Sequence, residues 1–150
     1  MSARSSTAAP LRPAPRHRPA ASAMSLLQTA RRGLIEAAES AAPAQRYVAA
    51  HLAALRAAAA VLAERADPGS RTRGRPRSVW VLLPEVEPAL REWAAFFAAG
   101  ADKRAAAEAG LPRAVTADEA DELLRDAEIF VSLVETTLGV PGQPMLPAVG

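Results

Sequence analysis

The sequence contains no cysteine and few aromatic residues, and these shortages narrow the chemistry available to the chain. Without cysteine it forms no disulfide and has neither a thiolate ligand for zinc nor a cysteine nucleophile. Histidine is almost as scarce, since His17 and His51 are the only two and lie in different regions of the chain. A metal site is therefore not expected.

The sequence also lacks the motifs of several large enzyme classes. It has no P-loop, no Rossmann signature and no nucleophile elbow, so we expect no cofactor. Its longest apolar runs, residues 57–63 and 93–99, reach seven residues, whereas a membrane-spanning helix needs roughly 20. These features predict a cytoplasmic protein without a membrane partner.

Positive charge is unevenly distributed, although the net charge is only +2. Residues 1–24 hold four arginines and no acid, and residues 71–77 hold four more, which leaves the rest of the chain acidic. Residues 1–24, rich in Ser, Ala and Pro, have too little apolar surface to fold, and residues 139–150 are rich in Pro and Gly. Both tails are predicted to be disordered, and Met24 is a candidate translation start.

Between the tails, helical periodicity predicts one all-α domain over residues 25–138. Ser25 is expected to cap the first helix, and Pro43 separates it from the second, which makes the two antiparallel neighbours. Thr116 and Glu119 form a capping box at the start of the last helix. The predicted fold is an up-and-down bundle of four main helices, over residues 25–42, 43–66, 84–99 and 116–138, plus a short helix over residues 102–109.

Two predictions concern which side chains are buried. In the second helix the apolar stripe is expected to consist of Val48, Leu52, Leu55, Ala59 and Leu62. The third helix, preceded by a kinked helical lead-in over residues 79–83, should supply most of the aromatic core. The last helix is expected to expose an acidic face, formed by Asp118, Glu119, Asp121, Glu122, Asp126, Glu128 and Glu135.

Two groups of residues are candidates for function. The first is the loop of alternating arginines, Arg71, Arg73, Arg75 and Arg77, which could bind phosphates or could be a solvated linker. The second is Arg46 followed five positions later by His51. Five helical positions turn through about 140°, so the two side chains do not share a face. On spacing alone, Arg46 fits a surface charge and His51 a boundary residue with one nitrogen in water.

Three stretches carry a resemblance to a known family: RYVAAHLAALRAAAAVLAER (46–65), VWVLLPEVEPALREWAAFFAAGADKRAAAEAG (79–110) and TADEADELLRDAEIFVSLVETTLG (116–139). The segment from Leu26 to Gly139 resembles an actinobacterial branch of the HEPN domains. This resemblance implies a helical bundle, often dimeric, that binds nucleotides or nucleic acid. Many HEPN proteins are metal-independent endoribonucleases with an Arg-x4-His motif contributed by both subunits, and Arg46 and His51 match that motif.

Three functions follow from these observations. The first is a module that binds RNA or nucleotide without catalysis, expected as a homodimer. The second is an endoribonuclease that uses Arg46 and His51 across a dimer interface. The third is a protein-interaction bundle with no role in nucleic-acid binding.

Overall fold

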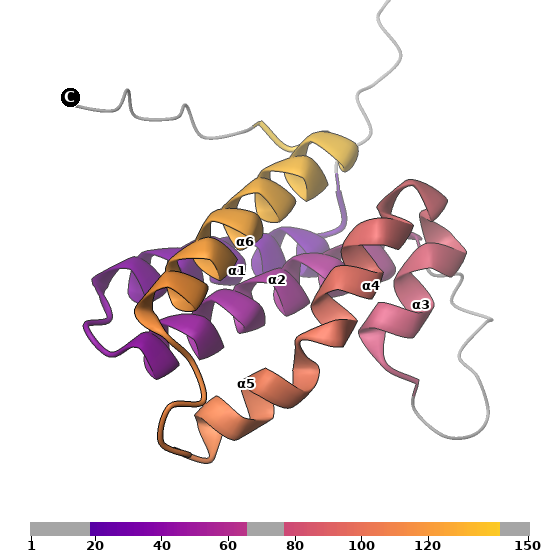
Figure 1. Ribbon diagram of the computed structural model, residues 1–150. Coiled ribbons are helices and arrows are strands. Elements are labelled where there is room, and N and C mark those ends of the chain that lie inside the picture. The colour runs from indigo at the N-terminus through magenta and orange to yellow at the C-terminus, as the bar shows by residue number, and fades with distance from the viewer. Residues whose placement is uncertain (1–18, 66–76, 142–150) are drawn as a thin grey trace, which may run out of the picture.

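A computed structural model describes residues 19–65 and 77–141, and within these ranges all regular structure is helical. Helix α1 (Ala21–Glu39) and helix α2 (Pro43–Arg65) form an antiparallel pair joined by three residues. Pro43 is the first residue of α2, where its missing amide hydrogen costs nothing. Figure 1 shows α6 (Ala117–Thr137) crossing this pair, with α3 and α4 together at the right and α5 at the bottom. The predicted all-α bundle is confirmed.

Helix α2 is the central helix, because it contacts α1, α3, α5 and α6. The prediction that its large apolar residues form the buried stripe is wrong. Val48, Leu52 and Leu55 are only half-buried, as are Ala59 and Leu62. With neighbours on several sides, α2 buries small residues where helices approach closely. Its buried residues are Tyr47, Ala50, His51, Ala53, Ala54, Ala57, Ala58, Ala60 and Val61.

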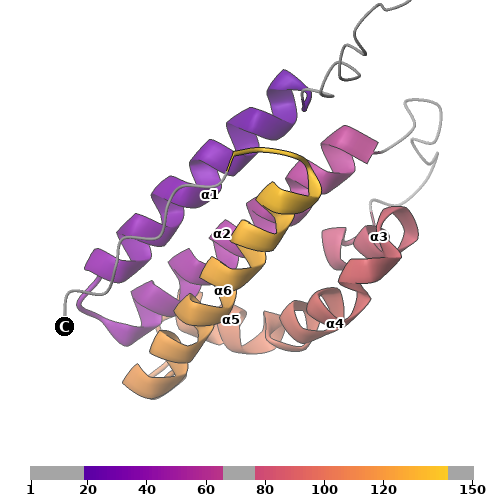
Figure 2. The same cartoon turned by 90° about the horizontal axis from the view of Figure 1, so that it is seen from above.

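The predicted third helix is divided into several elements. Helix α3 (Val79–Val86) contains Pro84 without ending there, and the chain turns at Glu87 before a short 3-10 helix (Pro88–Leu90) and helix α4 (Arg91–Ala99). The backbone at Glu87, with φ −145° and ψ 84°, lies outside the α region, which the ring of a following proline disfavours. Pro88, rather than Pro84, is therefore the break. Figure 2 shows α3 and α4 as separate helices with different directions.

The elements that follow agree closely with the sequence. Helix α5 (Ala101–Glu108) is the predicted short helix. Helix α6 begins at the predicted capping box, in which the Glu119 amide donates to the Thr116 hydroxyl at 3.1 Å and the Thr116 amide donates to the Glu119 carboxylate at 3.0 Å. The aromatic prediction is also confirmed, since Trp80 and Phe97 lie in the core against Phe130 of α6.

The N-terminal boundary differs from the prediction. Helix α1 begins at Ala21 rather than Ser25, and Ala23 is fully buried, so the predicted tail already contributes to the fold. The Ala20 amide donates a 2.6 Å hydrogen bond to Glu64 near the end of α2, which fixes the start of α1. The rest of the predicted tails, residues 1–18 and 142–150, lies outside the described residues.

Helix α2 also modifies the expectation about membranes. Among the described helices it alone is long and apolar enough to cross a membrane by length and composition. The prediction from uninterrupted apolar runs did not identify α2, because His51 and Arg56 interrupt its runs. An average over a longer window still finds the helix apolar. The central position of α2 gives its apolar character a structural reason, since the core helix of a bundle has the same composition.

Candidate functional site

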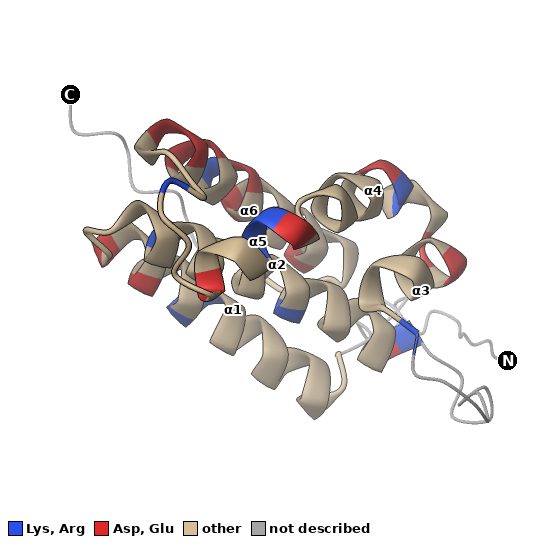
Figure 3. Cartoon of the chain, turned by 60° about the horizontal axis from the view of Figure 1, so that its bottom comes forward, with Lys and Arg blue, Asp and Glu red and all other residues tan. Residues whose placement is uncertain are grey.

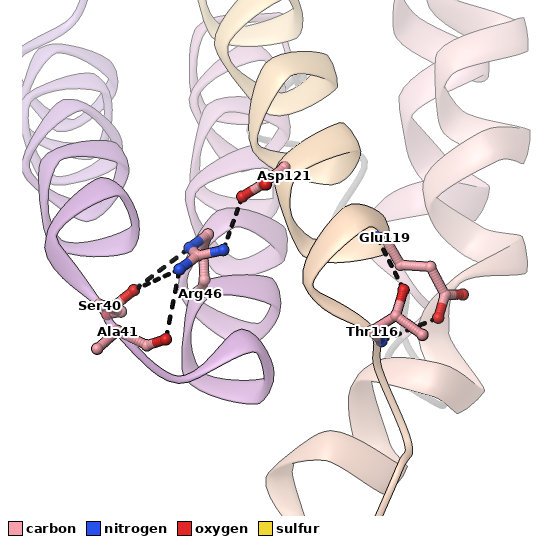
Figure 4. Close-up of polar contacts among 6 residues, drawn as sticks. All are labelled: Ser40, Ala41, Arg46, Thr116, Glu119 and Asp121. Atoms are coloured by element: carbon pink, nitrogen blue, oxygen red, sulfur yellow. Dashed lines mark hydrogen bonds and ion pairs between the residues drawn. The ribbon is translucent and has the colours of Figure 1, made fainter.

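Arg46 lies at the junction of three helices. Its guanidinium donates to the carbonyl of Ser40, the C-cap residue of α1, at 2.9 and 3.3 Å, and more weakly to the Ala41 carbonyl at 3.4 Å. A further N–H pairs with Asp121 of α6 at 2.6 Å (Figure 4). A cation at the carbonyl end of a helix satisfies acceptors that have no partner within the helix. Arg46 therefore closes the α1–α2 turn and ties it to α6.

His51 is buried in the aromatic part of the core, with 2 % of its surface exposed. The prediction that one of its nitrogens contacts water is wrong, because α3 and α4 cover this side of α2. The ring meets Trp80 and Phe97 edge-on, with centroids 6.1 and 5.9 Å away. Its Nε2 lies 3.1 Å from the Phe97 carbonyl oxygen, and Nδ1 is buried without a hydrogen-bond partner among the described residues.

These contacts determine the protonation state of His51. A carbonyl oxygen can only accept, so Nε2 carries the proton and Nδ1 is left as a bare acceptor. A second proton would place a charge among aromatic rings, and burial accordingly lowers the pKa of His51. Nearby Arg104 lowers the pKa further, while the Phe97 carbonyl and Glu108 act in the opposite direction.

Arg46 and His51 thus do not form a common site within the chain. Arg46 binds carbonyls at the α1–α2 turn and a carboxylate of α6, whereas His51 contacts side chains and a carbonyl of α3 and α4. This agrees with the angular separation predicted from their spacing.

Arg77 is the one member of the predicted arginine loop that lies in a described range. It pairs with Glu85 of α3 at 2.6 Å, and both side chains are largely exposed. Arg71, Arg73 and Arg75 lie outside the described residues.

The described ranges hold 11 of the 18 basic residues of the chain and 15 of its 16 acidic residues, which gives them a net charge of −4. Acidic side chains concentrate on α6 (Figure 3). In the described part of the chain no three potential metal ligands come together.

Glu135 is not part of the exposed acidic face, contrary to prediction. It is 4 % exposed and accepts a 3.0 Å hydrogen bond from Nε of Arg31 on α1, and a second guanidinium nitrogen of Arg31 also contacts it. That nitrogen reaches Ser132 as well, at 3.0 Å. The hydrogen bond to Glu135 raises the pKa of Arg31. No local pattern identifies this pair, since the partners are 104 positions apart.

An open groove of about 610 Å³ runs between α1 and α6 beside this ion pair. Its lining is mainly apolar and includes Leu27 and two strongly exposed residues, Ile35 of α1 at 59 % and Ile129 of α6 at 56 %. Arg32 and Glu128 lie on opposite walls. Arg32 contacts only Thr29 of its own helix among the described residues, at 3.1 Å. Glu128 makes no hydrogen bond or ion pair there, although its charge helps to raise the pKa of Arg31 in the same groove.

The class of protein is an all-helical bundle domain with one central helix and a groove between α1 and α6. The family model HEPN_SAV_6107, which represents one group of HEPN domains, matches residues 37–135. This is about two thirds of the chain, which belongs to this HEPN family. No curated protein and no solved structure matches the chain.

Proposed function

We propose that this HEPN domain is a noncatalytic interaction module that self-associates through the groove between α1 and α6. The observation that carries the proposal is the groove itself, in which exposed isoleucines from two helices are flanked by an unpaired charge on each wall. Exposed large apolar residues that gather along a groove are typical of a protein interface.

The noncatalytic part of the proposal is based on the contacts of Arg46 and His51. A general acid or base must reach its substrate, and His51 is enclosed by Trp80 and Phe97 with its proton directed at a carbonyl. Arg46 already uses its donors on α1 and α6. Catalysis would require both side chains to leave contacts that stabilise the bundle.

A second copy of the chain fits the groove because its two walls are complementary in charge. The unpaired cation is on α1 and the unpaired anion is on α6. A two-fold axis through the groove brings Arg32 of each copy against Glu128 of the other, since such an interface places the same surface of both subunits together. The isoleucines of the two copies then cover one another.

A charge exchange tests this arrangement in the full-length chain by analytical ultracentrifugation. Arg32→Glu and Glu128→Arg should each weaken the dimer at least tenfold, because like charges then meet across the axis. The double variant restores opposite charges and should recover most of the affinity. Arg125→Glu, which changes an exposed charge of α6 outside the groove, is the matched control. A monomeric wild type, or single variants that dimerise like the control, would contradict the proposal.

Nucleic-acid binding is a second candidate, supported by the segregation of charge. The described residues carry a net −4, which favours the arginine-rich segment as the source of phosphate contacts, with Arg71, Arg73 and Arg75 next to Arg77. If all four neutralise phosphates, log affinity for RNA should fall against log salt with a slope of about −3 to −4. Replacement of the four by serine should flatten the slope and leave the fold intact. An unchanged slope would exclude this segment as the RNA contact.

The endoribonuclease alternative is distinguished by a cleavage assay on single-stranded RNA in EDTA. We expect no cleavage by the wild-type chain. Cleavage that His51→Ala abolishes would overturn the noncatalytic proposal, provided that circular dichroism shows the variant to be folded.

A further inference from the structure

A second surface feature lies between α4 and α6, away from the residues that line the α1–α6 groove. It is an open cleft of about 330 Å³, lined by Glu92, Trp93 and Phe96 of α4 and Asp126 of α6. Phe96 is 45 % exposed, and its ring meets Trp93 edge-on with the centroids 6.3 Å apart. Trp93 is held from behind by Phe97 and Phe130, at 6.0 and 5.6 Å. The aromatic wall is therefore fixed by the core.

The two carboxylates of this cleft are not used in ion pairs within the fold, although Glu92 lies in the first turn of α4, where a negative charge favours the helix terminus. Neither Glu92 nor Asp126 has a hydrogen-bond or ion-pair partner among the described residues, whereas Asp121 and Glu119 of α6 are both paired. The nearest basic residues in sequence, Arg91 and Arg125, are not among the residues that line the cleft. Two anions without ion-pair partners beside the exposed Phe96 ring and the half-buried Trp93 ring form a surface that attracts cations.

The chemistry of the lining selects among cations. A guanidinium is planar, so it can stack on an indole or phenyl face, and its five N–H donors can simultaneously reach carboxylates at its edge. A lysine ammonium is a strongly hydrated point charge, which loses more solvation in such a site. A quaternary ammonium is attracted by the same charges and rings, but it has no N–H to donate a hydrogen bond to either carboxylate. Arginine is the side chain that uses every lining residue.

We propose that the α4–α6 cleft binds an arginine side chain presented by a basic segment of a partner protein. The proposal is independent of self-association, because the two surfaces share no lining residue. It also differs from nucleic-acid binding, since it requires a cationic ligand rather than phosphate. The module would then have one face for its own copy and one for a basic partner.

The test titrates the full-length protein with a synthetic peptide in which arginine alternates with glycine, followed by the NMR signals of the Trp93 indole and the Phe96 ring. We expect both signals to shift with saturation. The peptide with citrulline in place of arginine has nearly the same shape but no charge, and the peptide with lysine keeps the charge without the planar donor group. Both should bind at least tenfold more weakly.

Variants of the protein locate the binding site. Glu92→Gln together with Asp126→Asn should weaken binding of the arginine peptide at least tenfold, because two charge-assisted contacts are lost. Glu122→Gln, which removes an exposed acid of α6 outside the cleft, is the control and should bind like the wild type. Phe96→Ala should also weaken binding. Equal loss in the Glu122→Gln control would show general attraction to an acidic surface, and this result, absence of binding, or equal binding of the lysine peptide would overturn the proposal.

Discussion

The two sides of helix α2 are packed in different ways. Toward α1 the contact includes small residues, among them Ala53 and the backbone of Ala49 of α2 with Gly33 of α1. A Cβ atom at Gly33 would lie 3.4 Å from the Cβ of Ala53, so the two helices are already in close contact. Toward α3 and α4 the space is filled by Trp80 and Phe97. In the α1–α2 interface the two backbones approach closely, whereas in the interface of α2 with α3 and α4 large side chains fill the space.

The two sides of α2 thus represent two ways of forming a core, by close approach of helices and by burial of large side chains. Small residues give close helix packing but offer little apolar area to each other, whereas a buried aromatic ring buries a large area. The aromatic side should therefore supply more free energy per residue, and the alanine side should limit how large a side chain can be. The following substitutions test both statements.

The largest expected effect is on the aromatic side. Phe97 is 1 % exposed and contacts Trp80, Trp93 and Phe130. Phe97→Ala should lower the free energy of unfolding by about 3–5 kcal/mol, as a cavity replaces the ring. Urea unfolding followed by circular dichroism measures the change. Phe96→Ala on the same helix removes a ring that is 45 % exposed and should cost about 1 kcal/mol or less. Equal costs would show that burial in the aromatic cluster is not what stabilises this side.

A smaller loss of stability is expected on the side of α2 that faces α1, where a substitution adds volume instead of removing it. Ala53 is fully buried opposite Gly33, and Ala53→Leu has no space to occupy unless α1 moves away. The cost should be about 1–3 kcal/mol, typical of overpacking. Ala63→Leu, in the exposed last part of the same helix, provides the matched control and should be nearly neutral. Stabilisation by Ala53→Leu would mean that the α1–α2 contact is looser than the structure shows.

The sequence predicted those features that depend on neighbouring residues. The Thr116–Glu119 capping box, the role of Pro43 and the separation of Arg46 from His51 each follow from local geometry, and all three appear in the structure. The prediction from hydrophobic periodicity failed for α2 because it assumes that the bulky apolar residues of a helix face the core. A helix with neighbours on several sides buries alanines instead.

Other features could not be predicted because they depend on residues distant in sequence. Glu135 lies in an acidic pattern and becomes buried only because Arg31 reaches it from α1. The start of α1 depends on Glu64 of α2. Both Pro84 and Pro88 could have ended a helix, and the structure shows that α3 ends before Pro88. The α1–α6 groove likewise exists only once the two helices are side by side.

The smallest expected effect concerns His51, which belongs to α2 but faces the aromatic side. Its pKa is lowered from 6.5 by burial in the folded chain, so the unfolded chain binds a proton more readily. Stability is fully present above pH 6.5 and is lost as the pH falls below it, by at most about 1.4 kcal/mol per pH unit. The depressed pKa of Glu119, about 2, acts in a lower window, from pH 4.5 downward.

Urea unfolding between pH 6.5 and 5 therefore isolates the contribution of His51. His51→Leu keeps a similar apolar volume without a titrating group, and we expect it to flatten the dependence of stability on pH in this range. His17→Gln removes the other histidine and should retain the wild-type slope. If the His51→Leu variant loses stability toward pH 5 as steeply as the wild type, the imidazole binds a proton as readily in the folded chain as in the unfolded chain, and its enclosure by Trp80 and Phe97 cannot be the state in solution.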